Sequence, residues 1–456
     1  MYRDDDTIAA VATGRGPAAL GIVRISGPES SEVLATVVPG TRATDKPRQM
    51  VHGRARDPSS SEIIDEVLCY FAPEPKTATG QDVAEIHGHG GPLVLGRLLD
   101  AVLRAGARPA NPGEFTARAF LSGRLDLTQA EAVMTLIGAR SERAAKTAVA
   151  NLQGAVAQRL GHELDRLTEI AAQVEAGLDF PDEDLPLDET DRLATALEQV
   201  AQSLESAERS YALGSRLADG ARVAIVGPTN AGKSSLLNRL VDEERALVDH
   251  EPGTTRDVVE GHAEIDGIPI VFRDTAGLRG TPDRVETRGI ERSREAASSS
   301  DLSLIVIDGA DRSPDRSAGL DELLSASASQ AIVAINKRDL PDWSDRLPTC
   351  LDGLASQAVS ALTAQGLPEL MDAIAEALGS SEQDHEPLLV TARQHAAVKS
   401  ALDRTSNAAR TLRRHRSVEL AAIDLSEART ELASLWGRDA SAEVIDAIFS
   451  TFCLGK

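Results

Sequence analysis

The residues best spaced for chemistry form a phosphate-binding pattern in the middle of the chain. The pattern G-x-x-x-x-G-K-[ST] is matched by Gly227, Gly232, Lys233 and Ser234. It follows the apolar run 223–226 and precedes an amphipathic segment, which is the strand–loop–helix context that such a loop requires. Glycines let backbone N–H groups surround phosphates, the lysine reaches the outer phosphates, and the serine hydroxyl can ligate Mg²⁺. The pattern predicts a nucleoside triphosphate site that uses magnesium.

Four further motifs follow in the order expected of a guanine-nucleotide domain. PGTTRD (252–257) offers threonine hydroxyls to Mg²⁺ and the γ-phosphate, and DTAG (274–277) adds an aspartate near the metal. NKRD (336–339) carries an aspartate that can accept from guanine N1–H and N2–H₂, and SAL (360–362) offers a backbone N–H to O6. Each motif alone is weak, but together they predict that the nucleotide is GTP.

One position in DTAGLRG (274–280) departs from Ras-type enzymes. There a glutamine after the glycine orients the attacking water, whereas here that place is Leu278. A leucine side chain cannot hydrogen-bond to water. Either the chain binds nucleotide without hydrolysing it, or the catalytic group lies elsewhere in the sequence.

Composition narrows the class of protein. A length of 456 residues predicts two to four domains. A formal net charge of −23 and an aromatic content of 3% oppose broad binding of nucleic acid and single-strand stacking, so any nucleic-acid partner would have to meet a local basic patch. The densest basic run is 410–416. It could contact nucleic-acid phosphates, but a solvated helix face explains it at least as well. The acidic start, the lack of a membrane-length apolar run and three scattered cysteines lead us to expect a cytoplasmic protein with no membrane partner.

The texture of the sequence changes along the chain. Short apolar runs such as 20–26 and 66–71 have the pattern of strands, and 91–106 has helical spacing, so the first part is predicted to be α+β. Two helical stretches, the first of which includes a helix expected from about 189 to 213, then flank an alternating strand–helix block. We interpret this block as an α/β domain inserted into a helical domain. The predicted domains are residues 1–122 (α+β), 123–219 (helical, first part), 220–379 (α/β nucleotide domain) and 380–456 (helical, second part).

Several segments together resemble one bacterial family. They are GIVRISG (21–27), EIHGHGG (85–91), NPGEFTARAFLSGRLDLTQAEAV (111–133), the inserted nucleotide domain and the terminal FCLGK (452–456). The resemblance, which covers essentially the whole chain, is to the MnmE (TrmE) family of potassium-activated tRNA modification GTPases. It implies a multidomain fold, with an N-terminal tetrahydrofolate-binding and dimerisation domain, a helical domain, and an inserted Ras-like P-loop GTPase domain.

The resemblance also implies how hydrolysis proceeds without the glutamine. In the family a K⁺ beside the phosphates supplies positive charge to the transition state, and its cage closes when two GTPase domains meet. The matching K⁺ ligands are Asn230, Asp249, Glu251 and Thr254. The family's water-positioning glutamate matches Glu286, although a glutamate there could instead cap a helix.

One loop departs from the family pattern. The family usually has Ser/Thr-Asp-Ile-Pro-Gly before GTTRD, whereas residues 249–253 read DHEPG. Backbone ligation tolerates the change, but the added carboxylates leave the strictness of the K⁺ dependence open. The predicted Mg²⁺ ligands are Ser234 and Thr255. The predicted GTP-binding residues are Asn230, Ala231, Gly232, Lys233, Ser234, Ser235, Asp249, Thr254, Thr255, Asp274, Thr275, Ala276, Gly277, Asn336, Lys337, Asp339, Ser360 and Ala361.

A folate site is implied in the N-terminal domain. The residues that match the family's contacts to 5-formyl- or methylene-tetrahydrofolate are Arg24, Glu85, Arg124 and Lys456. A glutamate can accept from pterin N–H groups, and cations can pair with the glutamate tail of folate; a strand-end ion pair of Arg24 with Glu85 is the alternative. The H-x-H of His87 and His89 has no third ligand in sight, so we do not expect metal there.

The implied function joins these parts. The family acts as a homodimer with a flavin-dependent MnmG-type partner, in a heterotetramer or larger complex, and adds a carboxymethylaminomethyl-type group at C5 of the wobble uridine of certain tRNAs. Cys453 has a possible role in the modification. The alternatives are a ribosome- or RNA-assembly GTPase without modification activity, and a nucleotide-gated binding module that does not hydrolyse GTP.

Overall fold

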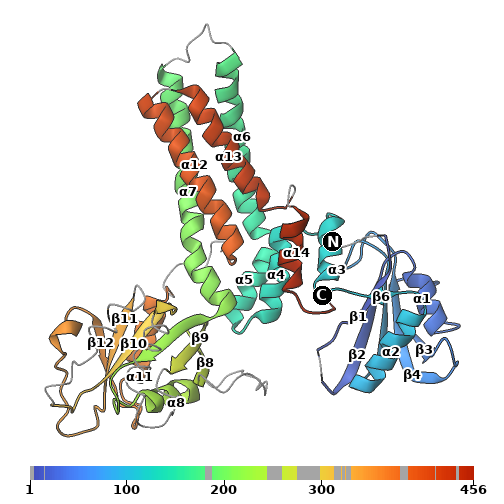
Figure 1. The fold of residues 1–456 in the computed structure, drawn as a ribbon, viewed down its shortest axis with the longest axis horizontal. Coiled ribbons are helices and arrows are strands. Elements are labelled where there is room, and N and C mark those ends of the chain that lie inside the picture. The colour runs from blue at the N-terminus through green and yellow to red at the C-terminus, as the bar shows by residue number, and fades with distance from the viewer. Residues whose placement is uncertain are drawn as a thin grey trace. The chain divides into compact units, whose positions relative to one another are not determined.

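The computed structural model describes most of the chain, in two compact units (Figure 1). One unit comprises Met1–Met134 with Thr430–Lys456, and the other comprises Thr135–Arg429. The described residues are 5–14, 16–179, 187–243, 259–274, 298–312, 320, 324, 330–379, 389–415, 417–437 and 441–455.

The first unit is built on a six-stranded sheet of order β3-β4-β5-β2-β1-β6, antiparallel except for the β1–β6 pair. Its strands are β1 (Ile8–Val11), β2 (Ala18–Ser26), β3 (Val51–Arg56), β4 (Ile63–Ala72), β5 (Val83–Gly90) and β6 (Arg108–Pro109). Its helices are α1 (Ser30–Val37), α2 (Pro92–Arg104), α3 (Glu114–Leu121), α4 (Leu127–Gly138, which continues past Met134) and α14 (Ala442–Ser450). The α+β prediction for this part of the chain is confirmed.

The sheet separates two kinds of side chain because successive residues of a strand point to opposite faces. Val23 and Ile25 of β2 and Ile86 of β5 are buried in a core that includes Leu34 of α1 and Leu98 of α2. The residues between them, such as Arg24 and Glu85, lie on the other face. That alternation keeps charged side chains on the face that α1 and α2 leave open.

A network of charges ties α3 to the strands. Arg118 is buried, and its guanidinium donates to Asp6, Glu114 and Gln81 side chains. Arg108 of β6 also donates to both oxygens of Glu114. Two arginines therefore neutralise two carboxylates inside the unit, an arrangement that buried charge requires.

The C-terminal residues pack against the same unit. Phe449 and Phe452 join Ala117 of α3 in a small core. A Cβ on Gly113 would lie 2.5 Å from the carbonyl oxygen of Phe449, and one on Gly455 would lie 2.3 Å from that of Val11. Both glycines are therefore needed for the tail to approach α3 and the end of β1 this closely.

The second unit contains a long helical bundle. Its helices are α5 (Glu142–Leu152), α6 (Ala155–Asp179), α7 (Leu187–Asp219), α12 (Ala392–His415) and α13 (Val418–Ser434, whose last residues pass Arg429). In Figure 1, α7 and α12 run side by side, and Arg413 of α12 pairs with Glu198 of α7 at 2.8 Å. The sequence predicted that α7 would end near Leu213. It runs to Asp219, past Gly214, because Leu217 is buried in the core of the adjoining α/β part.

The α/β part has a six-stranded sheet of order β12-β11-β10-β7-β9-β8, parallel except for the β8–β9 pair. Its strands are β7 (Ala221–Val226), β8 (Val259–Ile265), β9 (Ile268–Asp274), β10 (Leu302–Asp308), β11 (Ala331–Asn336) and β12 (Ala355–Ala358); the described helices are α8 (Lys233–Glu243) and α11 (Leu367–Ala377). Val223 and Ile225 face one core, and Ala224 and Val226 face the other. Burial on both faces is typical of a parallel sheet covered by helices.

The α/β part is inserted into the bundle, as the sequence predicted. Gly220, with φ of +83°, separates α7 from β7. After α11 the described chain resumes at Leu389, whose N–H donates to the Ser210 hydroxyl of α7 at 3.2 Å. Departure and return thus lie on the same helix. The predicted fold class, α+β, helical and Ras-like α/β, is confirmed. Among the helices that the structure describes, none is long and apolar enough to cross a membrane.

Candidate functional site

The phosphate loop connects β7 to α8 and depends on two glycines. Gly227 has φ of +142°, and a Cβ there would lie 2.1 Å from the Val306 carbonyl oxygen. Gly232 has φ of +92°, and a Cβ there would lie 2.3 Å from Asn336 Nδ2. Both positions need positive φ and close backbone approach, so only glycine fits. The loop can therefore present its N–H groups at the N-terminus of α8, where the helix favours anions.

Lys233 is buried at the start of that helix. Its ammonium donates to the carbonyl oxygens of Gly227 and Pro228, at 2.9 and 2.6 Å. The charge is thus held within the loop, where a β- or γ-phosphate would lie. Ser234 and Ser235 follow on the first turn and are exposed, as is Asn230, whose φ is +63°. Hydroxyl and amide oxygens in these places suit a hard cation such as Mg²⁺ or K⁺.

Asn336 joins the phosphate loop to the base-binding loop. Its Nδ2 donates to the Ala231 carbonyl at 2.9 Å, and its Oδ1 accepts from the Ala361 N–H at 3.0 Å. The side chain is 2% exposed. Nearby, the Ser360 hydroxyl donates to Asp339 Oδ1 at 2.5 Å, which fixes the carboxylate predicted to read guanine. The structure therefore brings together the predicted residues on the base side of the site.

Two contacts at this site were missed by sequence reasoning. Arg239 of α8 donates to the carbonyl oxygens of Ala361 and Leu362, at 3.3 and 3.0 Å. Lys337 Nζ lies 2.6 Å from Asp308 Oδ2 at the end of β10. Neither partner lies near the other in sequence, and no motif spacing signals such a pair. Arg239 anchors the base-binding loop to the helix that starts at the phosphate loop.

Part of the predicted nucleotide site lies outside the described residues. For Asp274 the structure gives only its place as the last residue of β9, beside Ile225 of β7. The predicted residues that fall outside the described ranges are Asp249, Glu251, Thr254, Thr255, Thr275, Ala276, Gly277 and Glu286, together with Leu278. The fit to Mg²⁺ and K⁺ therefore rests on Ser234 and Asn230.

A second cluster lies on the open face of the N-terminal sheet. Arg24 of β2 and Glu85 of β5 are register partners, and Arg24 Nε lies 2.9 Å from Glu85 Oε1. The arginine also stacks over the Phe115 ring of α3, 5.8 Å from its centroid. The structure thus brings together two of the four residues predicted to bind folate. An ionised carboxylate flanked by a cation can accept hydrogen bonds from the amino and ring N–H groups of a pterin. These two side chains therefore fit that ligand.

The cluster has a third member that the sequence did not assign to it. His87 Nε2 lies 3.0 Å from Glu85 Oε2. The pKa of Glu85 lies below its ordinary value because His87 hydrogen-bonds to it and the Arg24 charge lies beside it, against the opposing effect of burial. His87 was considered only as half of an H-x-H pair. Its spacing of two from Glu85 on a strand was the signal that placed it on the same face.

The other predicted folate residues lie in less constrained places. Arg124 is exposed after α3, and the structure records no hydrogen bond or ion pair from its side chain to Arg24 or Glu85 within the described ranges. Lys456 lies outside the described residues. Gly455 packs on Val11, whose neighbour Ala10 is the register partner of Arg24. The tail therefore reaches the edge of the cluster.

Cys453 lies in that tail. It is exposed, and its carbonyl accepts from the Gly113 N–H at 3.4 Å. Cys69, by contrast, lies in the sheet core, where burial raises the pKa of its thiol to about 11. Cys453 is thus the accessible thiol of the two.

His89 belongs to a different contact. Its Nδ1 lies 2.8 Å from Asp65 Oδ1, and its ring is largely exposed. No group of three or more metal-ligating side chains is found in the part of the chain that the structure describes.

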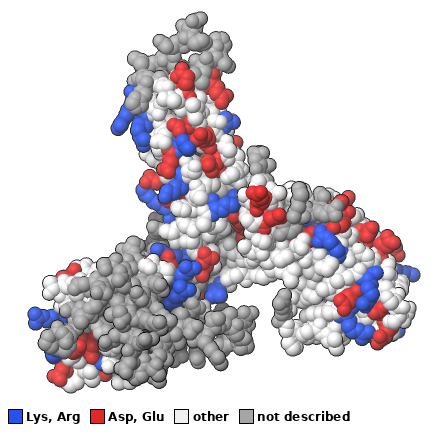
Figure 2. Space-filling view, viewed as in Figure 1, with Lys and Arg blue, Asp and Glu red and all other residues white. Residues whose placement is uncertain are grey.

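The basic run 410–416 is partly neutralised within the bundle. Arg413 binds both oxygens of Glu198, and Arg410 donates to Asn407. Figure 2 shows acidic and basic side chains interspersed over the visible face of the helices. One arginine of the described part of the run is therefore paired with an acidic side chain of α7.

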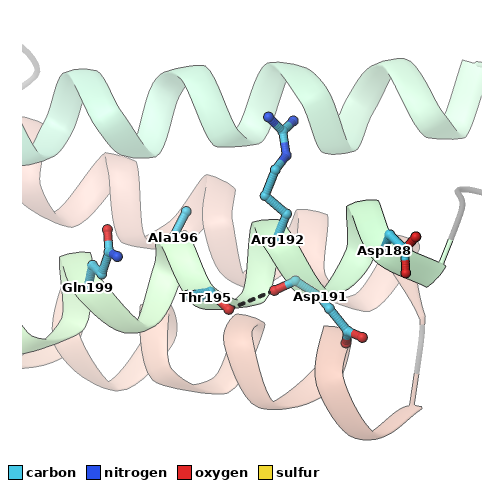
Figure 3. Close-up of a pocket in the computed structure, with 6 residues that line it drawn as sticks. All are labelled: Asp188, Asp191, Arg192, Thr195, Ala196 and Gln199. Carbon is cyan, nitrogen blue, oxygen red and sulfur yellow. Dashed lines mark hydrogen bonds between the residues drawn. The ribbon is translucent and has the colours of Figure 1, made fainter.

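A shallow groove runs along the N-terminal half of α7 (Figure 3). It has a volume of about 450 Å³ and includes Asp191 and Thr195, whose hydroxyl donates to the Asp191 carbonyl at 2.8 Å. Arg192 points away toward α6 and donates to Gln173 at 2.9 Å. The lining residues are Asp188, Asp191, Arg192, Thr195, Ala196 and Gln199. The groove contains none of the predicted site residues.

Comparison with known proteins accounts for nearly the whole chain. Residues 7–124 match the family model described as the GTP-binding protein TrmE N-terminus, and residues 127–453 match the MnmE helical domain. Three similar relatives are each named tRNA modification GTPase MnmE. The relative from Opitutus terrae is 40% identical over 99% of both chains, that from Natranaerobius thermophilus is 36% identical over 99% of this chain and 100% of its own, and that from Coxiella burnetii is 38% identical over 100% of both.

Solved structures give a partial match. The G domain of the FeoB iron transporter of T. maritima is 27% identical and covers 34% of this chain and 98% of its own. Its TM-score is 0.27, too low to support an argument.

Proposed function

This chain belongs to the MnmE family of tRNA modification GTPases, and from that premise we propose that it hydrolyses GTP to support modification of the wobble uridine in certain tRNAs. The proposed product carries a carboxymethylaminomethyl-type group at uridine C5, and the reaction uses a flavin-dependent partner of the MnmG type. The observation that carries the proposal is the Asn336 bridge, which joins a phosphate loop to a guanine-reading loop in a chain of this family.

The residues of the phosphate loop have separate tasks in phosphoryl transfer. Backbone N–H groups and Lys233 hold the phosphates, and Ser234 would hold Mg²⁺ with Thr255. Asn230 would contribute to a K⁺ site with Asp249, Glu251 and Thr254. These cations would supply positive charge where negative charge develops on the phosphoryl oxygens. In phosphoryl transfer the protein positions these groups and forms no covalent bond to the phosphate.

Water positioning is assigned to Glu286 in place of the glutamine that Leu278 replaces. A carboxylate can accept a hydrogen bond from the attacking water, directly or through a second water. Glu286→Ala should abolish phosphate release while leaving GTP affinity unchanged, and release by the unmodified protein should rise with K⁺ relative to Na⁺. Turnover by the variant near the wild-type rate in K⁺ buffer would remove Glu286 from this role.

The folate-binding part of the proposal rests on the sheet face. Arg24, Glu85, Arg124 and Lys456 would hold 5-formyl- or methylene-tetrahydrofolate, whose one-carbon unit would be transferred in the modification. Glu85 would accept from the pterin, and the cations would pair with the glutamate tail. Cys453, exposed in the tail beside this face, would take part in the modification. If bound 5-formyl-tetrahydrofolate protects Cys453 from an alkylating reagent, the thiol lies at the ligand.

The proposed assembly is a homodimer formed through residues 1–122, with the GTPase domain (220–379) inserted between the helical segments 123–219 and 380–456. Nucleotide-driven opening and closing of two GTPase domains would then be transmitted through the helices. The dimer would join the flavin-dependent partner in a heterotetramer or larger complex.

One experiment tests the whole proposal. Mass spectrometry of wobble uridines from cells that lack this protein should show loss of the C5 group, and return of the gene should restore it. Unchanged wobble uridines together with a defect in ribosome assembly would favour an RNA-assembly GTPase instead.

A further inference from the structure

We propose that His87 is a positioning residue of the folate-binding face, where it and Arg24 hold the Glu85 carboxylate ready to accept from the ligand. The inference rests on the proposed folate function and deepens it. His87 is not among the residues that the family resemblance assigned to the ligand, so the role is argued from contacts within this sheet.

The sheet register places these side chains in two adjacent rows. In one row Glu85 of β5 lies between Arg24 of β2 and Tyr70 of β4. In the next row His87 lies between Ile22 and Leu68 of the same two strands. Because residues two apart on a strand share a face, the His87 ring stands beside the Glu85 carboxylate. The aliphatic neighbours in its row offer the ring no competing polar side chain.

The contacts assign one partner to each carboxylate oxygen. Arg24 Nε is 2.9 Å from Oε1, and His87 Nε2 is 3.0 Å from Oε2. The side chains of the three residues are 22%, 17% and 16% exposed for Arg24, Glu85 and His87, so the pair of contacts is shielded but open on one side. A carboxylate oxygen can accept more than one hydrogen bond. Glu85 can therefore keep both partners and still accept from N–H groups of a bound pterin.

A carboxylate held on both sides is oriented before the ligand arrives, so little side-chain entropy is lost on binding. Removal of the His87 donor would leave Oε2 without its protein partner and free the carboxylate to rotate. Gln at this position keeps an N–H donor, whereas Leu keeps bulk without a donor. This pair of substitutions separates the hydrogen bond from simple packing.

The hydrogen bond also sets the pH range of binding, because only the ionised Glu85 carboxylate can accept on both oxygens. The pKa of Glu85 is lowered by His87 first and by the Arg24 charge, with burial acting in the opposite direction. Loss of His87 would raise that pKa, so the loss of binding on acidification would begin at higher pH. The other ionisable groups on this face near the pair are Arg24 and Tyr70 in the Glu85 row, His89 further along β5, Glu66 further along β4, and His52 and Arg54 on β3. His89 is engaged by Asp65, and Glu66 by Arg54.

The test is titration calorimetry of the full chain with 5-formyl-tetrahydrofolate between pH 4.5 and 8. We expect His87→Leu to weaken binding by about 10- to 150-fold at pH 7, the range for a hydrogen bond to a charged group. Its affinity should fall further, relative to wild type, as the pH drops below 6. His87→Gln should keep wild-type affinity within about threefold and the wild-type pH profile. His52→Leu, on the exposed edge of the same face, is the matched control and should behave as wild type.

The outcomes separate the inference from the function on which it rests. Absence of folate binding by the wild-type chain would refute both. Wild-type binding with an unchanged affinity and pH profile in His87→Leu would overturn the role of His87 and leave the folate site standing. Equal losses in the Leu and Gln variants would also overturn it, because packing would then explain the effect. Circular dichroism and GTP binding check folding, and His87→Met replaces the leucine variant if that does not fold.

Discussion

The phosphate loop and the sheet-face cluster solve the placement of charge in different ways. In the loop, the Lys233 ammonium is held by backbone carbonyls of its own turn, and Asn336 bonds to backbone groups on both sides. On the sheet, Arg24, Glu85 and His87 hold one another by their side chains. The phosphate loop is therefore held by backbone groups, whereas the sheet-face cluster is held by contacts between its side chains.

The difference determines how each site tolerates substitution. A site made of backbone groups depends on the residues that permit the backbone path, which here are glycines. A site made of paired side chains depends on every partner, because removal of one leaves another polar group unsatisfied. Substitution of the glycines should therefore impair ligand binding most in the phosphate loop. On the sheet face, substitution of the paired charged side chains should impair it most.

The largest expected effect is at Gly232. Valine would force a branched side chain into a φ of +92° and place its Cβ 2.3 Å from Asn336 Nδ2. We expect Gly232→Val to weaken GTP binding by more than about 100-fold, or roughly 3 kcal/mol. Fluorescent GTP titration measures the loss, and 5-formyl-tetrahydrofolate titration of the same variant should match wild type. Near-normal GTP affinity would show that the loop does not depend on its backbone path.

The second effect concerns the buried charges beneath the sheet site. Arg118→Met removes the buried one of the two arginines that pair with Glu114 and Asp6, while it keeps bulk. Breaking a buried charge pair costs about 3–5 kcal/mol in local stability. Hydrogen exchange of the full chain should show faster exchange at the Arg108 and Ala110 amides, which donate to the carbonyl oxygens of Thr7 and Ala9. Exchange at β7 and β10 should stay unchanged, and equal acceleration there would contradict a local role.

The third effect tests whether a side chain also supports the backbone-built site. Arg239 donates to two carbonyls of the base-binding loop. Loss of both bonds in Arg239→Ala should weaken GTP and GDP alike by about 5- to 30-fold, roughly 1–2 kcal/mol. Arg239→Lys should lose less, because one donor can remain. An effect on GTP alone would mean that the arginine acts through the γ-phosphate instead of the loop.

The same contrast explains what the sequence could predict. The phosphate loop was predicted because its requirements are local: glycines, a lysine and a strand–helix context within a dozen residues. The helical bundle and the inserted α/β part were predicted from periodic texture. Strands such as β2 were predicted because they contain short apolar runs.

Long-range pairings were harder to predict. Arg239 contacts carbonyls more than 120 residues away, and nothing in its local sequence announces that contact. The role of His87 needed the register of β5 against β2 and β4, which depends on how the whole sheet assembles. The extension of α7 past Gly214 depended on burial of Leu217 in another part of the unit. In each case tertiary packing decided what local pattern could not.

The smallest expected effect lies at an ion pair in the nucleotide site, Lys337 with Asp308. The two side chains are 32% and 22% exposed, so water screens their attraction. In Asp308→Asn the amide oxygen can still accept from the Ala310 N–H, which now bonds to Asp308 Oδ1 at 2.9 Å. We expect GTP affinity to fall by no more than about threefold, and the difference to shrink in high salt.

Glu85→Gln, by comparison, should weaken binding of 5-formyl-tetrahydrofolate by about tenfold or more, because it replaces a carboxylate that is held by two partners. If Asp308→Asn cost as much as Glu85→Gln in paired titrations, the nucleotide site would also depend on paired charges, and the contrast between the two sites would fail.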